Sequence, residues 1–393
     1  MILLILAALQ VQASPDSLRL PDAIRLALAQ RGEVHAAGAL VAAARAAFRQ
    51  AGTIPNPVGR WSYTDDPPRE HASIEQPLDW LLTRGPARGA ARAARTAVAF
   101  DSAQRVADVA AEVRIAFNRL LAARDHALLA EERQQLADSL LAIADRRLAA
   151  GDISRFERDQ VALERSRNSL GFSETRQALA IARAELIRTL GLPADARLPP
   201  VAGTLSEGLE RAVTPAGIED SPVLFSALAD SAAARQQVTA AARARIPFPA
   251  FEIGADWADP AAPDQRLLLV GVSLPIPLWH QGGADLALAR ANAAGAAARV
   301  RETRASLRAS LAAAEAALTE TAARVRIIQD SLLPAARRLR EQAERAYAQG
   351  ETGMLPLLEA VRSERDIAVL RLDALTAWQE ARAEWSRLLG IIE

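Results

Sequence analysis

The sequence predicts a mostly helical protein in which one unit, a long helical hairpin joined to a short β-hairpin, is built twice. Glycines recur at a fixed distance, since Gly151 and Gly191 are followed 199 positions later by Gly350 and Gly390. Apolar residues recur at steps of three and four over stretches far longer than an ordinary globular helix. Two pairs of short segments alternate apolar and polar residues, as half-buried strands do. Together these patterns indicate an internal duplication with long helices and four strands.

The duplication divides the chain into two repeats with the same order of elements. The turn at 148–154 corresponds to 347–353, and the segment 54–57 corresponds to 246–249 at an offset of 192. We expect a signal peptide over 1–13. The first repeat should cover 14–200, with a β-hairpin at 57–79 and a helical hairpin at 84–191. The second repeat should cover 201–393, with a β-hairpin at 249–275 and a helical hairpin at 284–390.

The composition excludes several classes of function. The 393 residues include 47 basic and 47 acidic side chains, every basic one an arginine, and this balance argues against a general nucleic-acid-binding protein. The absence of cysteine excludes disulfides and thiolate zinc sites. The four histidines are far apart in sequence, and no phosphate-binding loop or HExxH helix is present. We therefore expect no enzyme, and no catalytic, cofactor-binding or metal-binding residues.

The N-terminus resembles a secretory signal. A short apolar run, 2–9, is followed by Ala13, a small residue suited to cleavage, although no arginine precedes the run. The alternative is a buried N-terminal helix. No later stretch reaches the roughly 18 uninterrupted apolar residues of a membrane-spanning helix. If the protein spans a membrane, it must do so with strands.

The predicted strands have one apolar and one polar face. The apolar positions are Trp61, Tyr63, Ile253, Trp257, Val270 and Val272. The polar positions are Arg60, Glu75, Glu252 and Asp256. This alternation is typical both of an ordinary sandwich strand and of a transmembrane barrel strand. Taken alone, the alternation favours the sandwich strand.

The long helices carry a coiled-coil pattern. In the second repeat the apolar seam is unbroken, with the members Leu311, Ala314, Leu318, Thr321, Val325, Ile328, Leu332, Ala335, Leu339, Gln342 and Ala346. In the first repeat the seam has the members Val106, Val109, Val113, Ala116, Leu120, Leu136, Leu140 and Ile143. Pro334 should kink the second long helix, and residues 20–50 should form one helix.

Four strands cannot close a barrel. If the strands lie in lipid, several copies of the chain must therefore contribute strands to one barrel, and three copies would supply twelve.

Three elements make this arrangement similar to the TolC-like outer membrane efflux protein family. The most specific is the tip of each helical hairpin, with small residues, a glycine and then a serine or threonine at 148–157 and 347–355. The others are the strand-to-helix segment at 76–88 and the hairpin terminator at 190–193. The resemblance covers 18–389 and implies a homotrimer with a twelve-stranded barrel in the outer membrane of a Gram-negative-type cell and an α-helical tunnel across the periplasm.

The resemblance also implies roles and partners. The chain would be a passive exit duct for an inner-membrane pump of the RND or ABC type and a periplasmic adaptor protein. The adaptor would dock at the hairpin tips, through Gly151, Ser154, Gly350, Thr352 and Gly353. Glu359 would form a gate with Arg362 near the symmetry axis. The apolar strand positions would face outer membrane lipid, and the polar ones would face the barrel lumen.

The main alternative is a periplasmic adaptor or another soluble coiled-coil scaffold, since such proteins also contain long helical hairpins. An adaptor usually carries one hairpin within β-rich domains, whereas this chain would carry two. Recovery with the outer membrane, as opposed to the soluble periplasmic fraction, distinguishes the two functions.

Overall fold

The structure is a computed structural model that describes residues 17–210, 217–262 and 264–392. The predicted signal peptide, 1–13, lies outside the described residues. The chain divides into two compact units, each drawn from both sequence repeats. The hairpin unit is drawn from 1–34, 105–216 and 309–393, and the strand unit from 35–104 and 217–308.

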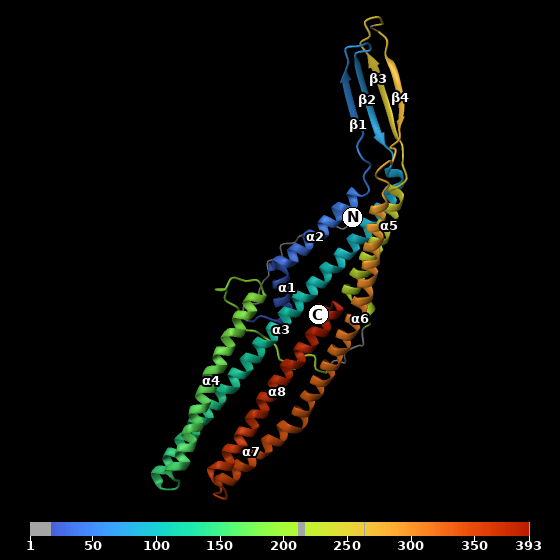
Figure 1. The fold of residues 1–393 in the computed structure, drawn as a ribbon. Helices are drawn as coiled ribbons and strands as arrows, with labels where there is room; N and C mark the ends of the chain where they lie inside the picture. The colour runs from blue at the N-terminus through green and yellow to red at the C-terminus, as the bar shows by residue number, and fades with distance from the viewer. Residues whose placement is uncertain (1–16, 211–216, 263, 393) are drawn as a thin grey trace. The chain divides into compact units, whose positions relative to one another are not determined.

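The strand unit contains one four-stranded antiparallel sheet (Figure 1). Its strands, in spatial order, are β1 (Val58–Tyr63), β2 (Glu70–Pro77), β3 (Ala250–Trp257) and β4 (Leu267–Ser273). The middle pair, β2 with β3, joins the two sequence repeats, and Glu75 lies directly opposite Glu252. The two expected β-hairpins therefore form one sheet.

Helices of the strand unit connect to this sheet. They are most of α2 (Gly32–Gln50), the start of α3 (Trp80–Ala150), α5 (Pro222–Ala244) and the start of α6 (Gly283–Ile327). Phe100 of α3 stacks on Phe225 of α5, with ring centroids 4.9 Å apart. The Arg88 guanidinium lies over the Phe48 ring of α2 at 5.1 Å. Aromatic and cation–π contacts thus supplement the small alanine surfaces between these helices.

The hairpin unit is helical. It contains α1 (Leu20–Gln30), the rest of α3, α4 (Arg155–Thr189), the end of α6, α7 (Leu333–Ala348) and α8 (Met354–Leu389). α3 with α4, and α7 with α8, form two antiparallel hairpins (Figure 1). The largest fully buried side chains of its core include Phe117, Leu121, Leu186, Leu375 and Val109.

Both expected glycine turns form, with equivalent hydrogen bonds. Gly151 has φ +80° and Gly350 has φ +74°, the left-handed region that glycine adopts without strain. The N–H of Gly151 donates to the carbonyl oxygen of Leu148 at 3.0 Å, and the N–H of Gly350 donates to that of Tyr347 at 3.2 Å. Donor and acceptor are each displaced by 199 positions between the turns, so one local motif ends both α3 and α7.

The seam prediction for the second repeat is correct up to Ile328 and wrong after it. A π-helical turn over Ile328–Leu332 precedes Pro334, where a kink was expected. The N–H of Leu333 donates to the carbonyl oxygen of Ile328, five residues earlier, because the following proline cannot continue the ordinary pattern. The turn inserts one residue into the seam. Leu332 and Leu339 are therefore exposed, and Ala336 is buried in their place.

The seam of α3 also changes along its length. Val109, Val113 and Leu120 are buried as predicted. Further along, Leu136 is 38% exposed and its neighbour Ala137 is buried. In a straight α-helix, positions seven residues apart do not point in quite the same direction. Over a long helix the buried face therefore shifts by one position relative to a strict seven-residue pattern.

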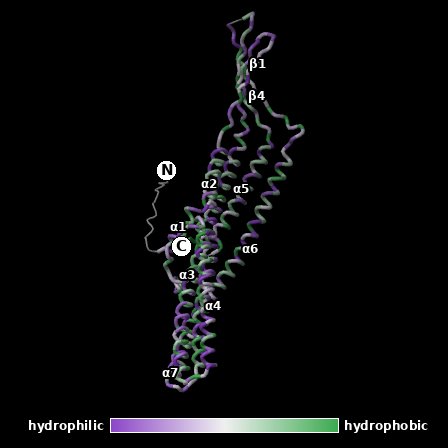
Figure 2. Tube along the Cα trace, turned by 90° about the vertical axis from the view of Figure 1, so that its left-hand side faces the viewer, coloured by the Kyte–Doolittle hydropathy of each residue, from purple (hydrophilic) through white to green (hydrophobic). Residues whose placement is uncertain are grey.

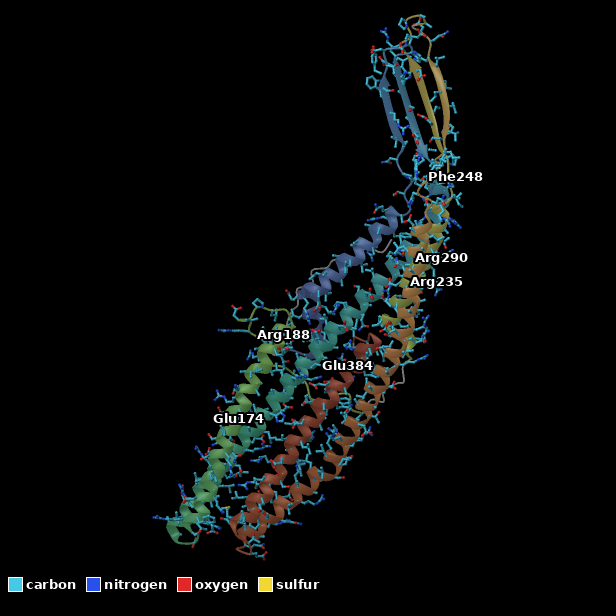
Figure 3. The ribbon with its side chains drawn as sticks, viewed as in Figure 1. Glu174, Arg188, Arg235, Phe248, Arg290 and Glu384 are labelled. Atoms are coloured by element: carbon cyan, nitrogen blue, oxygen red, sulfur yellow. The ribbon has the colours of Figure 1, made fainter. Side chains whose placement is uncertain are left out.

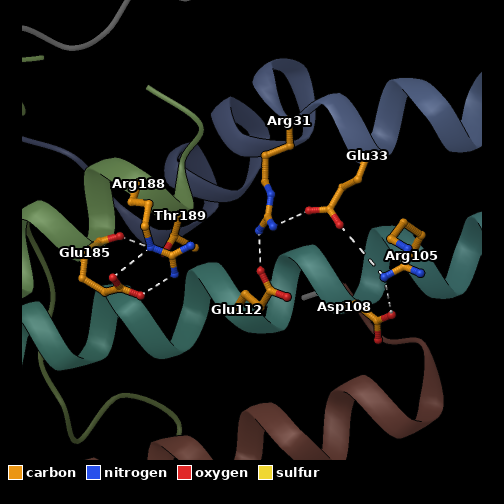
Figure 4. Close-up of polar contacts among 8 residues, drawn as sticks. All are labelled: Arg31, Glu33, Arg105, Asp108, Glu112, Glu185, Arg188 and Thr189. Carbon is orange, nitrogen blue, oxygen red and sulfur yellow. Dashed lines mark hydrogen bonds and ion pairs between the residues drawn. The ribbon is translucent and has the colours of Figure 1, made fainter. Parts of the chain in front are cut away.

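The predicted single helix at 20–50 is interrupted at Arg31, which has extended backbone angles. Its guanidinium is paired with Glu33 and with Glu112 of α3 (Figure 4). The carboxylate of Glu33 also lies 4.0 Å from Arg105. A charge cluster with α3 thus occupies the point where α1 gives way to α2.

Hydrophobic and hydrophilic residues are interleaved along the helices (Figure 2). Among the described residues, no helix is both long enough and apolar enough to cross a bilayer.

Candidate functional site

The sheet register places every predicted strand residue. Directly paired residues in an antiparallel sheet project to the same side. The polar face holds Arg60, Glu75, Glu252 and Asp256 together with Ser62, His71 and Ser73. The apolar face holds Trp61, Tyr63, Ile253, Trp257, Val270 and Val272 together with Ile74 and Phe251. Each predicted set therefore lies together on one face.

Charges on the polar face are mostly paired. The Arg60 guanidinium lies 2.7 Å from the Glu75 carboxylate, and His71 Nδ1 lies 3.0 Å from Asp256. Glu75 and Glu252 are directly opposed, so their like charges lie on adjacent strands. Such a face is suited to water and unsuited to hydrocarbon.

Each face has exceptions. Leu267 and Leu269 of β4 fall on the polar face, and Glu70 of β2 falls on the apolar face. The Glu70 carboxylate accepts a hydrogen bond of 2.7 Å from the indole Nε1 of Trp257. Sequence alternation does not reveal this bond, because β2 and β3 belong to different repeats.

The sheet has two edges. β1 and β4 each pair with one strand only among the residues described, and most side chains of both strands are exposed. Their outward backbone N–H and C=O groups are therefore available to another strand.

The hairpin tips lie at the ends of α3 and α7. An added Cβ at Gly151 or Gly350 would meet no atom within 4 Å, so the space beside each turn is open. The Arg147 guanidinium lies 4.5 Å from the centroid of the Tyr347 ring and links the two tips. The tip positions predicted from the resemblance are all exposed.

The two tips differ in how the return helix begins. Ser154 caps α4 in a capping box, because its hydroxyl accepts from the N–H of Glu157 while its own N–H donates to the Glu157 carboxylate at 2.8 Å. The hydrogen bonds that the Glu157 carboxylate accepts from the N–H and from the hydroxyl of Ser154 lower the pKa of Glu157. At the equivalent position, Gly353 precedes α8 without a side-chain cap. Ser154 therefore has a local structural role whatever docks there.

The two predicted gate residues, Glu359 and Arg362, do not form an ion pair with each other in the part of the chain that the structure describes. Glu359 is exposed and makes no ion pair with the residues that the structure describes. Arg362 has a different partner, because its Nη2 and Nε donate to Glu164 of α4 at 2.5 and 3.1 Å. Arg365 Nη1 also lies 3.5 Å from Glu164. Glu164 is 198 positions from Arg362, and no local pattern identifies it.

A second charged cluster connects α8 with α3. Figure 3 shows Glu384 on α8, where its carboxylate accepts from Arg387 Nη2 at 2.7 Å. Arg387 Nη1 also donates to Asp108 of α3 at 3.3 Å. The hydrogen bonds from Arg387 lower the pKa of Glu384, and burial offsets part of this effect.

No curated protein matches the chain by sequence. Residues 217–391 match the family model described as outer membrane efflux protein. The fold is similar to that of CusC, with a TM-score of 0.78, 19% identity, and 95% of this chain and 92% of that chain covered.

Two further channels have the same fold. The outer membrane protein VceC of Vibrio cholerae matches with a TM-score of 0.75 and 16% identity, over 95% of this chain and 97% of that chain. The outer membrane channel MtrE of Neisseria gonorrhoeae, in its open state, matches with a TM-score of 0.76 and 18% identity, over 95% and 89%. The predicted resemblance is confirmed: residues 217–391 match the outer membrane efflux protein model, and the chain as a whole has the fold of these outer membrane channels.

Proposed function

We propose that three copies of this chain form the outer membrane exit duct of a tripartite efflux or secretion system. The chain serves as a passive conduit that works with an inner-membrane pump and a periplasmic adaptor. The observation that carries this proposal is the sheet, which has one apolar face, one charged face and two edges that no other described strand covers.

The edges support association of several copies. An open sheet edge cannot sit in hydrocarbon, because each unpaired backbone group there costs several kcal/mol. Pairing β1 of one copy with β4 of the next satisfies both edges at once. Three copies of the sheet supply twelve strands, a number within the range of known barrels.

The helices support association as well. Exposed apolar side chains recur every seven residues along α4, at Phe156, Leu163 and Leu170, which are 71%, 54% and 63% exposed. This spacing is typical of a coiled-coil seam. We assign the stripe to packing against another copy, which would extend the helical wall.

The hairpin tips and Glu359 take the roles that the resemblance implies. The glycine turns form the adaptor-docking surface, and Glu359 lies at the mouth of the duct. The open space beside Gly151 and Gly350 supports a close approach by another helical tip. The signal peptide over 1–13 directs export.

Disulfide trapping tests the proposal, because the natural chain has no cysteine. Within one sheet, β1 and β4 are separated by two strands, about 14 Å, which is too far for a disulfide. Cysteines placed at Gly59 or Trp61 in β1, combined with cysteines at Leu268, Val270 or Val272 in β4, can therefore bond only between copies. We expect at least one pair to give dimer and trimer bands from outer membrane fractions.

The control is the directly opposed pair Ala72→Cys and Ala255→Cys, which should close within one chain and give no ladder. Monomers for every β1–β4 pair, or recovery of the protein in the soluble periplasmic fraction, would refute the duct and favour a soluble adaptor or scaffold.

A further inference from the structure

A cavity of about 350 Å³ lies inside the hairpin unit, among α3, α4, α7 and α8. Five arginines and three glutamates line it, together with apolar side chains, so its wall carries a surplus of two positive charges. Its size is at the lower end of the range for small-molecule sites. The proposed duct function assigns no role to this space.

Two of the three glutamates already have arginine partners. Glu164 accepts hydrogen bonds from Arg362. Glu364 lies 2.6 Å from Arg340 and 3.7 Å from Arg337. These pairs neutralise part of the wall. Among the residues that the structure describes, Arg133 is the arginine of this wall that has no carboxylate in ion-pair contact.

Arg133 is half-buried in this wall. No carboxylate oxygen among the described residues lies within ion-pair distance of its guanidinium, which instead donates to the main-chain oxygen of Arg365 at 3.1 Å. Burial, and then the positive charge of Arg365, lower the pKa of Arg133 to about 10. Asp366 and Glu132 act in the opposite direction on this pKa but do not outweigh the lowering. A half-buried cation with no carboxylate in ion-pair contact is stabilised when an anion approaches it.

We propose that this cavity binds a small amphiphilic organic anion. Its carboxylate, sulfonate or phosphate group is held by Arg133 through the forked hydrogen bonds that a guanidinium group makes with two oxygens of an oxyanion. Its apolar part packs against Leu129, Leu136 and Leu333 of the same cavity wall.

The site is shared by both hairpins, since Arg133 belongs to α3 and Leu333 to α7. A ligand that contacts both stabilises their packed arrangement in proportion to the logarithm of its concentration. This inference goes beyond the duct and does not depend on it, because the site lies within one chain.

Calorimetric titration of the full chain in detergent tests the site with three ligands of one shape: naphthalene-2-sulfonate, neutral 2-naphthalenemethanol and cationic 2-naphthylmethylammonium. We expect the sulfonate to bind one per chain and at least tenfold more tightly than the other two. Arg133→Gln should weaken sulfonate binding roughly tenfold, and Arg133→Lys should retain part of it. Arg146→Gln is the matched control, since Arg146 is exposed on the same helix and outside the cavity.

Equal binding of the three ligands, or equal sulfonate binding by the Arg133→Gln variant, would overturn the site. The absence of sulfonate binding at about 1 mM would do the same. Melting without ligand provides a second readout: Arg133→Gln should melt no lower than the natural chain, because it removes an unpaired half-buried charge. A clearly lower melting temperature would mean that Arg133 serves the fold, and the ligand role would be rejected.

Discussion

Replacing Glu164 with glutamine should loosen the connection between the two helical hairpins. The Glu164 side chain is 9% exposed and accepts two hydrogen bonds from Arg362, with Arg365 close by. Glutamine keeps the size of the side chain but removes its negative charge. The guanidinium groups of Arg362 and Arg365 then repel each other, and Arg365 keeps its ion pair with Asp366 at 2.9 Å.

The magnitude follows from burial. Removing one partner of a fully buried ion pair costs about 3–5 kcal/mol. Water reaches the arginines here, because the Arg362 and Arg365 side chains are 35% and 30% exposed, so the pair is screened. We therefore expect a loss of about 2 kcal/mol, which corresponds to a fall of about 4–8 °C in melting temperature for a unit of this size.

Thermal melting followed by circular dichroism measures this loss. Asp138→Asn is the matched control, because the pair of Asp138 with Arg165 is 48% and 43% exposed and should contribute less than about 1 kcal/mol. The double variant Glu164→Gln with Arg362→Gln should recover part of the stability. Equal shifts for Glu164→Gln and Asp138→Asn would refute the reasoning that burial makes this pair the stronger one.

Four further predictions concern the sheet, the tips, the gate and acid stability. Ile253→Arg should impair trimer assembly, seen as loss of heat-resistant trimer on gels, at a cost of about 2–4 kcal/mol if the residue lies near the bilayer midplane; Glu252→Gln should not, and equal effects would contradict the assigned faces. Gly151→Val should abolish export in an efflux assay while trimers persist. The positive φ at this position strains valine, but the open space around it accepts the side chain. Normal export by this variant would contradict a docking role for Gly151. Glu359→Gln should reduce cation selectivity in planar bilayers, and unchanged current and selectivity would place the residue away from the constriction. Glu384→Gln should destabilise by at most about 1 kcal/mol at neutral pH. The pKa of this carboxyl is lowered in the folded state, so its stabilisation is complete above the unfolded pKa and is lost as pH falls through the folded pKa; a deficit in melting temperature that stays constant down to pH 3 would contradict this linkage.

Local rules made much of the fold predictable from sequence. The reversals at Gly151 and Gly350 follow from a residue that accepts positive φ, placed after a heptad-bearing helix. The two faces of the sheet follow from a side-chain period of two, which depends only on strand geometry. The order of elements follows from the duplication. For the turns and the strands, the decisive interaction lies within a few residues of the pattern that predicts it.

Tertiary structure decided the rest, because the determining contacts join distant segments. The pairing of β2 with β3 joins two repeats, and no local pattern states which strand lies beside which. Arg362 bonds to Glu164 of α4, and no pattern within α8 indicates that partner. Pro334 predicts an irregularity in the helix. Only the packed structure shows that one inserted residue leaves Leu332 exposed and places Ala336 on the buried face. Periodicity specifies which residues share a face, whereas packing between helices specifies what that face meets.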